Sequence, residues 1–325
     1  MNIPNAFQVP EFESLLGEYK QHAIDYLTQK DPDKAAEVAE AFANESELLA
    51  QITQAFVLKR IAEIREQNYW ALQMFRKFVT ESDMVDLLAL QYNLKRQVLE
   101  PEDTSVFPPK PAVMESNDDL LRRFDLAPYQ FHTTGTRMGY KFHSLTLDER
   151  PIIKIDSEPD AVVMRYEFPK ERQPNPVKDA EPRMLEPNSG KVDIAILSRE
   201  NPDGHASPEL LDRVSRYLNR DDIAQGSDDL AVKSAMPVSY RIVATLFTGG
   251  EPAHDVQQPD AEAAAWQFAE SAHRLSGNVD RLKLGEVLYA LNPKRVILTE
   301  PAADIACNWD EAPFCTEVII DVRTE

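Results

Sequence analysis

The amino-terminal part of the chain carries apolar side chains at helical spacing. In residues 11–30 they recur every three or four positions, as on one face of an amphipathic helix. Asn44, with Glu47 three residues later, resembles a capping box and predicts the start of a second helix. Without Gly or Pro up to Val79, that helix is expected to have about 35 residues and a length of ~50 Å. A short third helix is predicted at 82–93.

The predicted long helix has more apolar positions than one packed face needs. A first stripe is followed by further apolar positions on a rotated face. Two interpretations stay open: an intramolecular helix bundle, or an extended arm whose stripe is buried by partner chains. Trp70 and Phe75 either continue the stripe or anchor the turn into the next helix. The candidate partner-interface residues are Leu49, Ile52, Phe56, Ile61 and Ile64.

From residue 191 onward the pattern changes to strand segments separated by helices. Apolar runs or strict alternation predict strands at 192–197, 232–247, 295–299 and 316–322. Helical spacing predicts helices at 208–219, 260–275 and 283–291. Ser207 ahead of Pro208 has the preferred order of a helix cap followed by proline. This order of elements predicts a sheet with helices on one face, and a core that includes Tyr240, Ile242 and Leu246.

Proline is frequent in the middle of the chain, whereas glycine is scarce throughout. The sequence has 23 prolines and 10 glycines. Because proline favours extended chain, residues 101–190 are expected to be a connector, with a short helix after Ser116 and an exposed loop or hairpin at 165–187. The expected fold class is α+β, with a long-helix arm at 1–100, this proline-rich connector, and a C-terminal mixed α/β interaction domain at 191–325.

Charge and composition exclude several classes of function. The chain has 35 basic and 55 acidic side chains, and its formal net charge is −20. Binding to nucleic acid or to an anionic membrane surface requires clustered Lys and Arg, so we expect neither as a partner. The start of the chain lacks the pattern of a signal peptide, and two cysteines cannot form a disulfide framework. We therefore expect the chain to be cytosolic when it is made.

No catalytic or ligand-binding motif occurs in the sequence. The P-loop, dinucleotide-binding, metalloprotease and nucleophile-elbow patterns are absent. His132 and His143 are eleven residues apart, and Cys307 and Cys315 are eight apart, spacings that do not favour a metal site. A nucleophilic Cys–His pair that meets only in the fold stays open as an enzymatic alternative. We otherwise expect no enzymatic activity, no cofactor, and no catalytic, cofactor-binding or metal-binding residues.

Several sequence blocks, in this order along the chain, resemble one protein family. They lie at 12–16, 89–96, 108–124, 126–143, 192–219, 228–247, 272–275 and 295–317. The LSRE…DG…ELL block, the VKSA block with the following ATL, and the TEPAADI segment are the specific ones. Together they resemble the baseplate J-like proteins of contractile-tailed phages with small baseplates (the peduovirus type), and of related prophages or tailocins. Within them Ser198, Arg199 and Glu200 follow a predicted strand, and they either cap local backbone groups or contact a partner.

The resemblance implies a structural wedge subunit of a phage baseplate that rearranges when sheath contraction is triggered. In such assemblies paired copies join another wedge protein through N-terminal helices in a three-way bundle, and the C-terminal domains pair to close a ring around the hub. The implied partners are other wedge proteins, a second copy of the chain, and sheath, hub or spike proteins. The implied location is the virion, after assembly in the host cytoplasm. The alternative is a cytosolic scaffold or tail-assembly chaperone that is not retained in the particle, and an acid-type hydrolase comes third.

Overall fold

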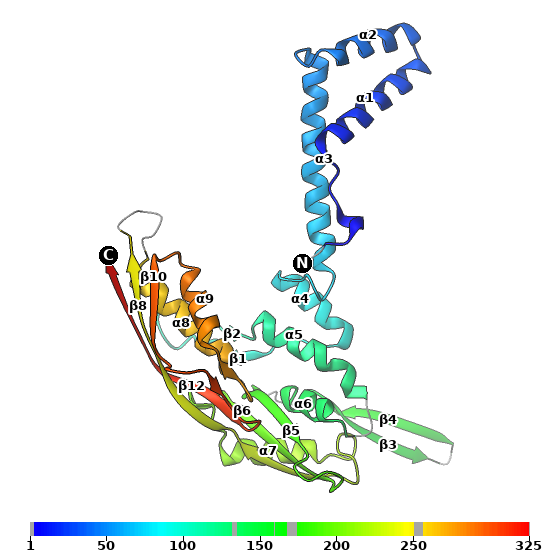
Figure 1. The fold of residues 1–325 in the computed structure, drawn as a ribbon. Helices are drawn as coiled ribbons and strands as arrows, with labels where there is room; N and C mark the ends of the chain where they lie inside the picture. Colours follow the sequence, from blue (N-terminus) through cyan, green and yellow to red (C-terminus); the bar gives the residue numbers. More distant parts are fainter. Residues whose placement is uncertain (1–2, 132–134, 159, 168–173, 250–255, 325) are drawn as a thin grey trace. The chain divides into compact units, whose positions relative to one another are not determined.

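The chain folds into two compact units. The residues described by the computed structural model are 3–131, 135–158, 160–167, 174–249 and 256–324. The first unit covers residues 1–91 and the second residues 92–325. The first is helical, and the second combines helices with several small sheets (Figure 1). The α+β fold class predicted from the sequence is thus confirmed.

The first unit consists of α-helices and short 3-10 turns. The α-helices are α1 (Phe12–Thr28), α2 (Pro32–Ala43), α3 (Leu48–Gln73) and α4 (Ser82–Ala89). The 3-10 turns are η1 (Asn5–Phe7) and η2 (Leu90–Tyr92), the second of which crosses the boundary between the units. Both α1 and α2 contact α3. The helices predicted at 11–30 and 82–93 are confirmed.

The predicted start of the long helix is wrong. The chain ahead of it forms α2, which Asp31 caps by accepting the backbone N–H of Lys34 at 3.3 Å. Asn44 ends α2, and its side chain accepts the N–H of Ser46 at 3.0 Å, so it forms a turn and not the predicted capping box. The helix α3 has 26 residues and therefore spans ~39 Å, which is shorter than expected.

A small apolar core joins α1 to α3. Val57 and Ile61, one turn apart on α3, pack in one cluster with Leu15 and Leu16 of α1, and all four side chains are buried. Phe12 covers the edge of this cluster. One face of α3 is therefore used for packing inside the first unit.

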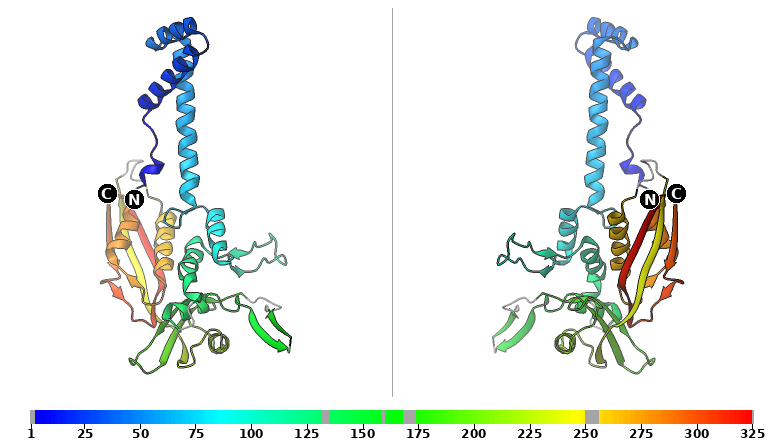
Figure 2. Two further views of the ribbon diagram at one scale, coloured as in Figure 1. Left: turned by 90° about the vertical axis from the view of Figure 1, so that its right-hand side faces the viewer. Right: turned by 90° about the vertical axis from the view of Figure 1, so that its left-hand side faces the viewer.

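The second unit contains the remaining helices and the strands. The helices are α5 (Asn117–Leu126), η3 (Ala127–Phe131), α6 (Arg137–Leu145), α7 (Pro208–Leu218), α8 (Gln258–Ala272) and α9 (Arg281–Tyr289). The strands are β1 (Val98–Glu100), β2 (Val113–Met114), β3 (Ile152–Glu158), β4 (Ala161–Glu167), β5 (Val177–Arg183), β6 (Lys191–Ser198), β7 (Asp229–Ser234), β8 (Met236–Thr248), β9 (Asn278–Val279), β10 (Arg295–Glu300), β11 (Ile305–Ala306) and β12 (Glu311–Thr324). The ribbon β3–β4 projects away from the larger sheets (Figure 2). The sequence predictions for α5, α7, α8, α9, β6, β10 and β12 are confirmed.

Two three-stranded sheets share one continuous run of chain. In the first sheet β6 lies between β5 and β7, and in the second β8 lies between β10 and β12. Only Ala235 separates β7 from β8, and its N–H donates to the carbonyl of Ile196 on β6 at 2.8 Å. The next N–H, of Met236, donates to the carbonyl of Asp310 beside β12 at 2.9 Å. The expected single sheet is therefore wrong, because the strand predicted at 232–247 changes partner at Ala235.

Helices cover one face of the second sheet. Tyr240, Ile242 and Leu246 alternate along β8 and are buried in a core with side chains of α8 and α9. These two helices lie on the same side of β8 and β12 (Figure 1). The predicted core residues of this strand are thus confirmed. The opposite face of the sheet carries Arg241 and Val243.

The middle of the chain, expected to be a connector at 101–190, contains α5, α6, β3, β4 and β5. The strand β5 is the buried edge of the first sheet, so the exposed loop or hairpin predicted at 165–187 is wrong over this strand. The strand carries the acidic side chain of Asp179, and its negative charge is balanced by an ion pair with Arg122 of α5 at 2.6 Å. Pro182 is tolerated because β5 is an edge strand.

Candidate interaction surfaces

Three of the candidate interface residues lie together on one side of α3. Phe56 is 64% exposed, Ile52 42% and Leu49 38%. Successive residues of an α-helix are about 100° apart, so these side chains fall within one sector of ~60°. Leu48, which is 71% exposed and one turn before Ile52, extends the same side. We call these four residues the apolar stripe of α3.

The other two candidates lie on a different face of the helix. Ile61 is buried in the core with Leu15 and Leu16. Ile64 is half-buried and about 60° from Ile61 around the helix. The buried face around Val57 and Ile61 is about 130° from the stripe, so α3 has two separate apolar faces. The first packs within the unit, and the second is exposed.

Leu48 was missed by the sequence analysis although a signal for it exists. The residues 48, 52 and 56 follow the i, i+4, i+8 spacing of one helix face. Trp70 lies five turns after Ile52 in the same sector and is half exposed, but Lys59, Glu63 and Gln67 occupy that side in between, so Trp70 is separate from the stripe. Phe75 lies beyond the end of α3 and contacts the ring of Phe7 edge-on at 6.3 Å, so it anchors the turn.

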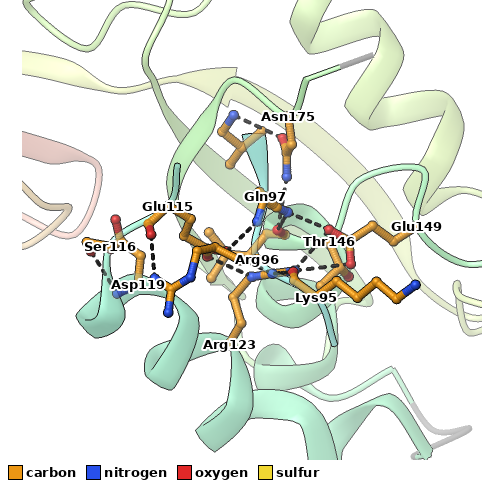
Figure 3. Close-up of polar contacts among 12 residues, drawn as sticks. Lys95, Arg96, Gln97, Glu115, Ser116, Asp119, Arg123, Thr146, Glu149 and Asn175 are labelled. Carbon is orange, nitrogen blue, oxygen red and sulfur yellow. Dashed lines mark hydrogen bonds and ion pairs between the residues drawn. The ribbon is translucent and has the colours of Figure 1, made fainter. Parts of the chain in front are cut away.

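A buried arginine organises the start of the second unit (Figure 3). The guanidinium of Arg123, on α5, donates to both carboxylate oxygens of Glu115 at 2.9 Å. It also donates to Glu149 at 2.9 Å and to the carbonyl of Lys95 at 2.5 Å. Burial raises the pKa of Glu115 above its ordinary value, although Arg123 acts in the opposite direction. Arg123 therefore ties three segments of chain together inside the protein.

Neighbouring side chains extend this network, which we call the Arg123 clamp. The N–H of Gln97 donates to Glu115 at 3.0 Å, and its side chain donates to the carbonyl of Leu145 at 3.0 Å. Asn175 donates to the same carbonyl at 2.9 Å (Figure 3). A cavity of about 500 Å³ lies beside the clamp and is lined in part by Gln97, Glu149 and Asn175. Because these polar groups already pair with one another, the arrangement is that of a structural clamp.

The specific motif residues after β6 bond to local backbone groups. Ser198 accepts the N–H of Glu200 at 3.0 Å, and Arg199 donates to a carbonyl of β5 at 2.6 Å. The carboxylate of Glu200 accepts the N–H of Ser207, the cap of α7, at 3.0 Å. Of the two interpretations left open by the sequence, local capping is therefore confirmed for Ser198 and Glu200, whereas Arg199 joins β6 to β5 and to Asp119 of α5.

The cysteines and histidines belong to no group that could hold a metal ion in the part of the chain that the structure describes. Cys307 and Cys315 are free thiols, and burial raises the pKa of Cys307 to about 11. Near neutral pH such a thiol stays protonated and is a poor nucleophile. Burial also lowers the pKa of His143 to about 4. His132, the other half of the metal pair considered above, lies outside the described residues.

Comparison with known proteins adds a relative that matches both units. No family model matches the chain. Across the described residues no helix is long and apolar enough to pass through a membrane. The chain is 28% identical to Baseplate protein J of Escherichia phage P2 over 314 residues, which cover 97% of this chain and 93% of that protein. Because it extends over nearly the whole of both chains, this similarity supports the membership of the chain in the baseplate J-like family.

Proposed function

We propose that the chain is a structural wedge protein in the baseplate of a contractile phage tail or tail-like particle. The observation that carries the proposal is the similarity to Baseplate protein J over 97% of the chain. At the coarser level this similarity supports a structural role in a phage baseplate. The finer part is that the chain pairs with itself and with other wedge proteins, and that the resulting ring rearranges when contraction is triggered.

The exposed stripe of α3 supports partner binding by the helical unit. Four large apolar side chains stay exposed within the first turns of α3, whereas the opposite face is already packed. An amphipathic face of this kind is stabilised when another helix covers it. The occupants we propose are the N-terminal helices of a second copy and of another wedge protein. Sheath, hub or spike proteins are further partners in the same ring.

Ion pairs between its elements support a second unit that moves as one body. Asp119 of α5 accepts from Arg274, after α8, at 2.9 Å and from Arg199, after β6, at 3.2 Å. Lys178 of β5 pairs with Glu270 of α8 at 2.6 Å. These pairs join elements of the first sheet to a helix of the second. A rearrangement on triggering requires two packings that are close in free energy, and we assign that change to contacts between chains.

The acidity of the chain supports a subunit that stays dissolved until it assembles. A net charge of −20 keeps copies apart in the host cytoplasm, and assembly then requires specific complementary surfaces. In this proposal the chain ends in the virion, has no enzymatic activity, and binds neither nucleic acid nor membrane.

Mass spectrometry of purified particles tests the proposal. We expect the chain to be present in intact tails at a fixed ratio to the tail-tube protein, and its deletion to abolish sheathed tails while tubes or spikes accumulate. If deletion blocks assembly but the chain is absent from finished particles, the scaffold or assembly-chaperone function replaces this one. If sheathed tails form normally without the chain, both proposals are wrong.

A further inference from the structure

The strand β12 is a long edge strand. It runs from Glu311 to Thr324, and among the described strands it pairs only with β8. An edge strand presents a row of unpaired backbone N–H and C=O groups, which proteins usually block with proline, shorten or cover. Pro313 lies near its start, but the nine residues 316–324 contain neither proline nor glycine. This outer half of β12 is therefore able to accept another strand.

The two faces of this outer half differ in character. Val318, Ile320 and Val322 point to the core under α8 and α9. The alternate residues point to the other face of the sheet and include Glu317 and Arg323. Their side chains are 53% and 63% exposed.

The charges of this segment complement themselves in one antiparallel register. When β12 meets a second β12 with Ile320 opposite Ile320, Glu317 lies opposite Arg323 of the other copy, and this pair occurs twice. On the core side, Val318 lies opposite Val322 in the same register. The contact is thus apolar beside the core. On the open face two Glu317–Arg323 pairs flank the centre, where Ile319 lies opposite Asp321.

Neighbouring registers are unfavourable because they bring like charges together. The core-side faces of the two strands stay on the same side of the joined sheet only if the centre of the pairing shifts from one residue to another, by whole positions. Centring on Ile319 places Glu317 opposite Asp321, and centring on Asp321 places the two Asp321 side chains opposite each other. The charge pattern therefore favours the register centred on Ile320 over both neighbours. A register centred on Val322 also places opposite charges together, Asp321 with Arg323, but it pairs only residues 320–324 of β12, whereas the register centred on Ile320 pairs residues 316–324.

The present ion pairs of these residues leave them available. Glu317 lies 3.6 Å from Arg241, and Arg323 lies 2.6 Å from Asp321, in pairs that are about half exposed. Exposed pairs of this kind contribute little to stability. Exchanging these ion pairs for new ones with a second strand therefore costs little stability.

We propose that β12 pairs antiparallel with β12 of a second copy, centred on Ile320, so that the two second sheets join into one sheet of six strands. The contact uses the same surface on both copies, and a two-fold axis perpendicular to the sheet keeps α8 of both copies on one side. The inference rests on the proposed function in one respect: in the proposed ring, this pairing is the contact between two copies of the chain. Pairing itself is a property of the chain in solution.

A charge-swap series on the full chain tests the contact by sedimentation. All variants also carry Ile52→Asp and Phe56→Asp, so that the stripe of α3 does not contribute to association. Glu317→Arg and Arg323→Glu each replace two opposite-charge pairs by two like-charge pairs, and we expect each to weaken dimerisation by ~30-fold. The combination of both should restore the dimer, because it re-forms the pair with reversed polarity. Arg295→Glu, on the other edge strand β10, makes the same charge change as Arg323→Glu and should leave the dimer unchanged.

Several results overturn the inference. The inference is wrong if the chain forms no dimer at ~100 µM. It is also wrong if the double swap does not restore the dimer, or if Arg295→Glu weakens dimerisation as much as Arg323→Glu does. If a reversal variant does not fold, Arg323→Lys is used instead, and a carbodiimide should link the new lysine to Glu317 between isotopically distinct copies. Lack of that link also overturns the pairing. A chain that dimerises through β12 but is absent from particles refutes only the proposed function.

Discussion

Replacing Ile52 and Phe56 with Asp should detach the helical unit from its partners without unfolding it. The two side chains are 42% and 64% exposed and lie about 130° from the core formed by Val57 and Ile61. Two exposed substitutions to Asp in a helix cost about 1 kcal/mol of unfolding free energy, mainly through helix propensity. The unfolding transition of the chain should therefore shift only slightly.

The effect on partner binding should be much larger. An isoleucine or phenylalanine side chain exposes roughly 200 Å² in an extended chain, so the exposed fractions correspond to ~200 Å² of surface available for burial by a partner. At about 25 cal/mol per Å² this area contributes up to ~5 kcal/mol to association. Loss of that contribution, with two charges buried in its place, should weaken binding by more than ~1000-fold.

Co-expression with the neighbouring wedge protein of the same phage or particle measures this effect. The double variant should fail to co-purify, while its circular dichroism spectrum and thermal transition stay close to those of the unchanged chain. The matched control is Leu58→Asp with Ala62→Asp, which alters exposed positions of α3 with the same spacing outside the stripe. If the control abolishes binding equally, charge and not the stripe is responsible. If Ile52→Asp with Phe56→Asp unfolds the chain, the stripe is part of an intramolecular core.

Three further predictions concern the second unit. Arg123→Met should lower the unfolding free energy by ~3–5 kcal/mol, because Glu115 is left buried without its partner; denaturant titration should show that adding Glu115→Gln recovers part of this loss, and no recovery would contradict it. Stability should fall as the pH drops from about 6.5 to about 4, since the lowered pKa of His143 makes the unfolded chain bind the proton first, at a cost of ~3 kcal/mol. His143→Gln should remove about half of this pH dependence in thermal melts, because burial lowers the pKa of His273 to about 4 as well, and an unchanged slope would count against it. Gly204→Ala should destabilise the chain by ~1–3 kcal/mol in the same melts, because φ is +84° and the new Cβ would clash with Leu197 Cδ1; an unchanged transition would refute the steric argument.

Elements whose signals are local could be predicted from the sequence. The helix α7 begins where Ser207 and Pro208 indicate, and Ser207 accepts the N–H of Leu210 as an N-cap should. The strand β8 follows its apolar alternation, with Ile242 and Leu246 buried. The stripe of α3 was also predicted in part, since Ile52 and Phe56 need only helical spacing to be found.

The errors concern features that depend on distant parts of the chain. Ala235 interrupts no local pattern, and it separates two sheets because β6 and β12 arrive from far along the sequence. From the sequence alone Asp179 is expected to be a solvent-exposed charge, because its partner Arg122 lies 57 residues earlier in the chain. Ile61 has the spacing of an interface residue, but α1 packs against it. The helix α2 was missed because it has few large apolar side chains to mark a face.

The continuous run of chain through β7 and β8 has a mechanical consequence. It extends from Asp229 to Thr248, with β6 running parallel to its first half and β12 parallel to its second half. A pull along this run loads the hydrogen bonds to both neighbours in shear, so many bonds must break together and not one after another. Tension that enters at one sheet passes into the other through covalent backbone. The two sheets therefore act as a single strut that resists stretching along its length.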